Sequence, residues 1–152
     1  MSVLSSAHSR IESHSVPTAA TSSWITLAGR ALFSAIFINS GLFHFMPQTA
    51  AYAASQGVPF ANLLVPASGV LAIAGGLSVL LGWRAKLGAW LLVLFLVPVT
   101  LTMHAFWAVK DPMMGQMQFA MFMKNLSMLG GALLITQFGP GALSVDAART
   151  RH

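Results

Sequence analysis

The sequence contains no cysteine and very little charge, and both absences narrow what the protein can be. Zero cysteines among 152 residues exclude disulfide bonds, thiolate catalysis and cysteine-ligated metal sites within this chain. Only 7% of the residues are charged and 56% are hydrophobic, whereas roughly a quarter of the residues of a soluble domain are charged. So few charges cannot cover a surface in water, and we expect lipid to be the main solvent.

Acidic residues are the scarcest charged type, with three Asp and Glu against eight Lys and Arg, for a formal net charge of +5. Most basic residues lie just outside apolar runs, which suits anionic lipid headgroups. No basic patch with interleaved aromatic residues is present, so we expect no nucleic-acid partner. No haem, flavin or iron–sulfur motif is present either, so any electrons would have to come from a partner or a substrate.

Four apolar segments dominate the chain, each about as long as the ~20 residues that cross a bilayer as a helix. They cover residues 24–45, 60–82, 86–107 and 117–138. Proline and glycine punctuate the breaks between them. The sequence therefore predicts an all-α, polytopic membrane four-helix bundle over residues 24–146. Residues 1–23 and 147–152 are expected to be cytoplasmic tails, the first of them disordered.

The first apolar segment leaves an alternative open, because Ala51-Tyr52-Ala53 resembles a signal-peptide cleavage site. Arg30 interrupts the segment, however, and its length suits a retained span.

The basic residues predict the orientation, because Lys and Arg favour the cytoplasmic side of a membrane. With four spans, one side holds Arg10, Arg84, Lys86, Arg149 and Arg151. The other side holds only Lys110. We therefore expect a multi-pass protein of the bacterial inner membrane with both termini in the cytoplasm.

Small residues recur on the second apolar segment at Ser68, Ala72 and Gly76, and the fourth segment contains Gly130-Gly131. In lipid, such stripes allow helix backbones to approach closely. We expect them to serve helix packing.

Ionisable residues inside a membrane are costly and should face protein or water. Four occur in the apolar segments: Arg30, His44, His104 and Lys124. The expected orientation brings all but Arg30 to the outer half, and the sequence predicts a periplasm-facing pocket. Its residues are His44, His104, Trp107, Lys124 and Asn125. With no acidic residue on any of these helices, the pocket should attract an electron-rich or anionic group.

Simpler interpretations remain open for several of these residues. Arg30 could extend to the headgroups, His44 could be wetted at the interface, and His104 with Trp107 could form an interfacial pair. Lys124 is the hardest to explain without a site.

Methionines crowd the same region and suggest Cu(I), which thioethers bind. Met117, Met121 and Met128 share a helix face with Lys124. Methionine is also a common filler of apolar gaps, and a lysine repels a cation. We therefore predict no metal site.

Several short motifs resemble the DoxX family of four-helix bacterial membrane proteins. They are Gly29-Arg30, Ser40-Gly41, Gly75-Gly76-Leu77, His104-Ala105-Phe106-Trp107, Met123-Lys124-Asn125-Leu126 and Gly139-Pro140-Gly141. The resemblance implies an inner-membrane redox role, as in quinone-linked oxidoreductase subunits or membrane partners in oxidative-stress defence. Many relatives of that family have Glu at the position of Ala72 and Lys at that of His44.

Two hypotheses follow from that resemblance. In the first, the pocket binds a quinone, with His44, His104 and Lys124 in catalytic roles. Trp107, Asn125 and Arg30 would then hold the cofactor. In the second, the chain is a noncatalytic anchor that recruits a soluble redox partner or steadies a membrane complex. The four helices could also assemble into a homo-oligomer. A small-molecule carrier is a third alternative.

Overall fold

The computed structural model describes residues 19–150, and every regular element within that range is helical. The elements are α1 (Ala19–Phe43), α2 (Pro47–Ser55), α3 (Ala61–Leu81), α4 (Ala85–Met103), the 3₁₀ turn η1 (Phe106–Ala108), α5 (Pro112–Phe138) and α6 (Val145–Arg149). The all-α prediction is confirmed. Most of the predicted N-terminal tail lies outside the described residues, although α1 begins at Ala19, inside the range predicted as tail.

Four segments are long and apolar enough to span a membrane: Ser23–Phe43, Ala61–Leu81, Ala85–Ala108 and Pro112–Phe138. Their large side chains face outward, with Leu32 79% exposed, Leu63 70% and Leu134 60%. Such a surface is stable in hydrocarbon and not in water. The chain is a multi-pass membrane protein.

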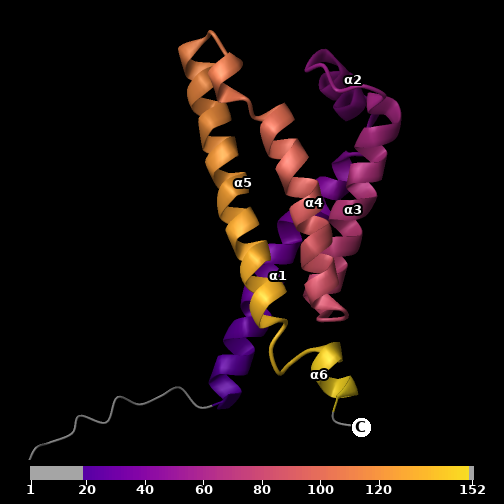
Figure 1. Ribbon diagram of the computed structural model, residues 1–152, viewed down its shortest axis with the longest axis vertical. Coiled ribbons are helices and arrows are strands. Elements are labelled where there is room, and N and C mark those ends of the chain that lie inside the picture. The colour runs from indigo at the N-terminus through magenta and orange to yellow at the C-terminus, as the bar shows by residue number, and fades with distance from the viewer. Residues whose placement is uncertain (1–18, 151–152) are drawn as a thin grey trace, which may run out of the picture.

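The helices pack in chain order, with α1 against α3, α3 against α4, and α4 against α5 (Figure 1). Helix α2 and η1 lie at one end of the molecule, while the α3–α4 turn and α6 lie at the other. Helices α1 and α5 approach each other where Gly131 faces the Phe33 ring, and they diverge toward the end that carries α2. The bundle is therefore open between α1 and α5 on that side.

Small residues make the contacts between neighbouring helices close, as the stripe on α3 predicts. A Cβ atom at Gly69 would lie 2.8 Å from the Gly41 carbonyl oxygen of α1. One at Gly75 would lie 2.9 Å from the Gly88 carbonyl oxygen of α4.

Of the predicted stripe, Ala72 is fully buried and a Cβ at Gly76 would lie 3.3 Å from the Phe37 Cβ, so both pack between helices. Ser68 instead lines a cavity, and a Cβ at Gly130 would meet nothing within 4 Å.

One helix boundary and one additional helix differ from the sequence-based expectation for local reasons. Helix α5 begins at Pro112, because Asp111 accepts a 2.8 Å hydrogen bond from the Met114 N–H and proline suits the first helical position. The short helix α2 was not predicted. It begins at Pro47 and buries Ala50 and Ala53 against α3.

The segment after α5 folds back on the molecule. Arg30 is 4% exposed and donates hydrogen bonds to the carbonyl oxygens of Pro140, at 2.9 Å, and Leu143, at 2.6 Å. The Asp146 carboxylate accepts hydrogen bonds from the Arg84 and Ala85 N–H groups at the start of α4. Residues around α6 thus join α1 to the α3–α4 turn.

Candidate functional site

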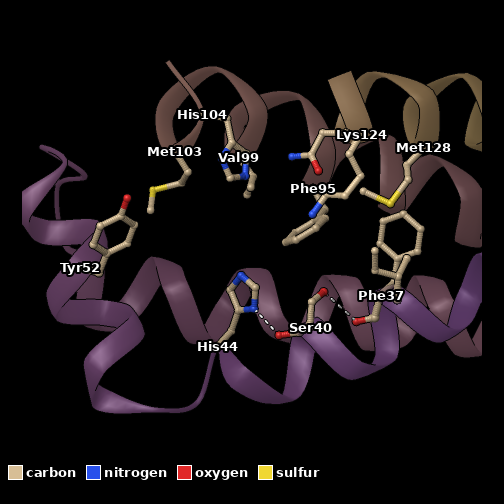
Figure 2. Close-up of a pocket in the computed structure, with 12 residues that line it drawn as sticks. Phe37, Ser40, His44, Tyr52, Phe95, Val99, Met103, His104, Lys124 and Met128 are labelled. Atoms are coloured by element: carbon tan, nitrogen blue, oxygen red, sulfur yellow. Dashed lines mark hydrogen bonds between the residues drawn. The ribbon is translucent and has the colours of Figure 1, made fainter. Parts of the chain in front are cut away.

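A cavity of about 210 Å³ opens in the gap between α1 and α5, with α4 behind it (Figure 2). Its lining residues are Ile36, Phe37, Ser40, His44, Tyr52, Phe95, Val99, Met103, His104, Lys124, Asn125 and Met128. Four of the predicted pocket residues, His44, His104, Lys124 and Asn125, therefore lie in one cavity. They come from three different parts of the fold, since His104 directly follows α4.

Asn125 and Lys124 form the α5 side of the cavity. Asn125 is only 4% exposed, and its side-chain amide has no hydrogen-bond partner among residues 19–150. Lys124 is exposed at the mouth of the cavity, and Figure 2 shows its side chain extending from α5 toward Ser40. An amide without a hydrogen-bond partner in the described chain thus lies beside a cation, and both line the same cavity.

Lys124 lies deeper along α5 than the sequence suggests. The helix has 27 residues, or about 40 Å at ~1.5 Å per residue, which exceeds a ~30 Å hydrocarbon core. Because α5 begins at Pro112, Lys124 is about 18 Å from its start, close to the middle of the helix. A charge at that depth costs about 2.5–3.5 kcal/mol on insertion scales unless it has a polar environment.

The two histidines face each other across the cavity, and in each ring one nitrogen makes a hydrogen bond to a protein oxygen. His44 Nδ1 lies 2.7 Å from the Ser40 carbonyl oxygen, and His104 Nδ1 lies 2.8 Å from Gln118 Oε1. Both partners are acceptors, so Nδ1 carries the proton in each ring. Each Nε2 is then left as an acceptor when the ring is neutral.

Ser40 and Tyr52 line the cavity but were not predicted as site residues. Ser40 precedes His44 by one helical turn, so helical spacing alone could have identified it. Tyr52 lies on α2, a helix that the sequence did not predict, and no sequence signal placed it there.

Two predicted site residues lie elsewhere. Trp107 does not line the cavity: it is 60% exposed and packs edge-on against Phe106 and Phe122. Helix α4 ends at Met103, and η1 turns Trp107 away from the register of that helix. Arg30, near the middle of α1, binds the backbone carbonyl oxygens of Pro140 and Leu143 before α6 and does not line the cavity.

No carboxylate in the described part of the chain balances Lys124. Asp111 caps α5 and Asp146 caps α4, at opposite ends of the molecule. Residues 19–150 also contain no group of three or more His, Cys, Asp or Glu side chains that could hold a metal ion. Of the methionine stripe, only Met128 lines the cavity.

A second, larger and mainly apolar cavity of about 570 Å³ adjoins the first between α2, α3 and α4. Its lining includes Leu64, Val65, Leu71, Leu94 and Pro98. His44, Phe95, Val99 and Met103 line both cavities and form the wall between them.

These features define a multi-pass helical membrane protein with a polar cavity open between two of its spanning helices. Residues 5–152 match the SURF4 family, and the chain belongs to that family. No solved structure matches the chain significantly.

Named relatives include bacterial and yeast proteins. The inner membrane protein YqjF of Escherichia coli is 31% identical over 122 residues, which cover 79% of this chain and 88% of that protein. The ER-derived vesicles protein ERV29 of Saccharomyces cerevisiae is 34% identical over 77 residues, 51% of this chain and 24% of that protein. The Surfeit locus protein 4 homolog of Schizosaccharomyces pombe is 32% identical over 125 residues, 81% and 37% respectively. The match thus spans less than half of either yeast protein.

The assignment to the SURF4 family overturns the resemblance to the DoxX family. The motifs behind that resemblance are glycine pairs, Gly-Pro turns and interfacial aromatic residues, which any small helical membrane protein uses for packing and turns. The predicted quinone-linked or redox role depended on that resemblance, in its catalytic form and in its anchoring form alike. That prediction was wrong.

Proposed function

We propose that the protein is a membrane-embedded binding protein whose polar cavity holds a ligand through an anionic or strongly hydrogen-bond-accepting group. The single observation that carries this proposal is the side chain of Asn125, which is 4% exposed as a residue, lines the cavity beside Lys124 and has no hydrogen-bond partner among the described residues. A buried polar group without a hydrogen bond costs about 1–3 kcal/mol, so such groups normally have partners. A ligand oxygen supplies the missing acceptor.

The charge of the cavity supports an anionic group over a cationic one. Lys124 is the only lysine or arginine of the lining, and no described carboxylate lies in the cavity to offset it. An anion in this space recovers much of the cost of placing the ammonium near the middle of the membrane. The Tyr52 hydroxyl is a further donor, while His44 and His104 can accept a hydrogen bond from the ligand.

The relatives also favour a binding function over an enzymatic reaction that would require the conditions of one particular compartment. The relatives of this chain include one named for ER-derived vesicles and another named as a bacterial inner membrane protein. A role common to both would have to operate in both membranes, as binding of a membrane-borne ligand does.

The bacterial inner membrane is the setting that we propose for this chain, with the cavity toward the periplasm. The Escherichia coli relatives support that location. The α3–α4 turn and α6, at one end of the described structure, carry Arg84, Lys86 and Arg149, whereas the segment between η1 and α5, at the other end, carries only Lys110. This distribution favours cytoplasmic termini. A reporter that is active only in the cytoplasm should be active when it is fused to the C-terminus. Activity of a C-terminal reporter that works only in the periplasm would contradict this orientation.

The absence of native cysteine provides a direct test of the cavity. The 152-residue chain with Ser40→Cys would be purified, and its modification by an anionic and by a cationic methanethiosulfonate reagent would be compared. Attraction by Lys124 should favour the anionic reagent on the order of tenfold. The matched control is Gln48→Cys, an exposed site at the same end of the molecule that lines neither cavity.

Adding Lys124→Met to Ser40→Cys should remove most of this preference while keeping a side chain of similar length. Equal rates with the two reagents in the single Ser40→Cys variant, or faster reaction with the cation, would overturn the proposed function.

A further inference from the structure

The two cavities differ in chemistry and share one wall. The smaller contains Lys124 and Asn125, whereas the larger is lined mostly by apolar side chains. The wall is thin, since the same four residues, His44, Phe95, Val99 and Met103, line both spaces. A polar site and an apolar site thus adjoin within the membrane.

We infer that the ligand is an amphiphile with one acyl chain and an anionic head, its head beside Lys124 and Asn125 and its chain in the apolar cavity. This inference depends on the proposed function and specifies its ligand class. The head contributes the acceptor oxygens that the Asn125 amide lacks. A carboxylate and a phosphate share this chemistry.

The volume of the apolar cavity supports one chain as its occupant. At about 570 Å³ it falls within the ~300–1,000 Å³ range of pockets that hold a single small ligand. Thr49, Gln56, Ser68 and Thr102 are among the few polar side chains of its lining, and none of them is charged. This cavity therefore offers the head nothing that competes with Lys124.

The wall between the cavities consists of side chains that can move without unfolding a helix. The His44 and Phe95 rings meet edge to face with centroids 5.6 Å apart. Met103 has the flexible, unbranched side chain that adapts to irregular spaces. Rotation of these side chains joins the two cavities and lets one ligand occupy both.

The head must determine which amphiphile binds. An acyl chain that leaves the bilayer for an apolar cavity moves between two hydrocarbon-like environments, so burial of the chain gives little net driving force. In the cavity, Lys124 and Asn125 can donate hydrogen bonds to the head, whereas the hydrocarbon of the bilayer offers no donor. These bonds, charge-assisted in the case of Lys124, therefore supply the selectivity.

The test uses the Ser40→Cys chain in lipid nanodiscs, with the rate of modification by the anionic reagent as the signal. The probes are palmitate, lysophosphatidate with a palmitoyl chain, and hexadecanol, each at the same mole fraction of lipid. Both acids should protect the introduced thiol about tenfold or more better than hexadecanol, because only they carry an anionic head. Rates at Gln48→Cys correct for the surface charge that the acids add to the bilayer.

A second pair of variants tests the chain site. Ala67→Trp adds bulk to the apolar cavity and should weaken protection by palmitate about tenfold, whereas Val70→Trp, on the same helix outside both cavities, should not. Protection by hexadecanol equal to that by the acids, or no effect of Ala67→Trp, overturns this inference.

The two proposals fail in distinguishable ways. In Ala67→Trp the preference for the anionic reagent at Ser40→Cys should persist, since Lys124 is unchanged. If that preference persists while the amphiphiles give no selective protection, the anion site stands and the amphiphile does not. If the preference is absent from the Ser40→Cys chain without further substitutions, the proposed function fails first.

Discussion

The Cβ atom of His44 lies against the backbone of α3 at Gly69, where an added methyl group would come within 2.7 Å of it. The same methyl group would meet the Gly41 carbonyl oxygen at 2.8 Å. His44 can therefore occupy its position in the cavity wall only because residue 69, on α3, is a glycine.

We predict that Gly69→Val separates α1 from α3 and displaces His44. Overpacking of this kind typically costs about 1–3 kcal/mol, so thermal unfolding in detergent, followed by tryptophan fluorescence, should occur at a lower temperature. Gly130→Ala is the matched control on α5, since its added Cβ meets nothing within 4 Å. A Gly69→Val chain as stable as the control would contradict the close contact.

Arg30 should matter for the C-terminal segment and not for the cavity. Arg30→Met removes the two hydrogen bonds to Pro140 and Leu143, and we expect faster amide hydrogen exchange in residues 139–149. Arg30→Lys should give an intermediate rate, because an ammonium lacks the planar fork of a guanidinium. In both variants the reagent preference at Ser40→Cys should stay unchanged, whereas its loss would place Arg30 in the binding site.

Asp146 caps a helix that has no side-chain cap from its own N-terminal residue. The residue before α4 is Arg84, whose φ of 47° lies in the left-handed region. Asp146 accepts hydrogen bonds from the Arg84 and Ala85 N–H groups at 2.8 and 3.1 Å. Asp146→Ala should cost about 0.5–2 kcal/mol, measured by denaturant unfolding. Asp111→Ala removes a single cap hydrogen bond, on α5, and should cost less; an equal or larger loss there would contradict the role of the second bond.

The sequence was sufficient to predict the four spans and to place together four of the twelve residues that line the smaller cavity. Lipid penalises every exposed polar group, so Lys124, Asn125, His44 and His104 could be expected to turn inward. Helical spacing then restricted which of them could meet. The prediction succeeded where the membrane imposes one strong constraint on each residue.

The remaining features depend on tertiary contacts that the sequence does not encode locally. Trp107 leaves the register of α4 because the helix ends at Met103, and no proline or glycine marks that end. The gap between α1 and α5 reflects where those two helices cross, and α6 is fixed by Arg30 and Asp146 at long range. Composition and spacing contain no signal for such contacts.

The hydrogen bond between His104 and Gln118 gives a prediction about protonation. Because Gln118 Oε1 accepts at 2.8 Å, the neutral His104 ring should carry its proton on Nδ1. Nitrogen-15 NMR of histidine-labelled protein, at a pH where both rings are neutral, should therefore show protonated Nδ1 and bare Nε2 for His44 and His104. Gln118→Leu should remove this tautomer preference from His104 alone, since His44 is held by the Ser40 carbonyl oxygen. A protonated Nε2 on His104 in the unsubstituted chain would reverse the donor and acceptor roles in the cavity, and the ligand facing it would then need an acceptor at that point.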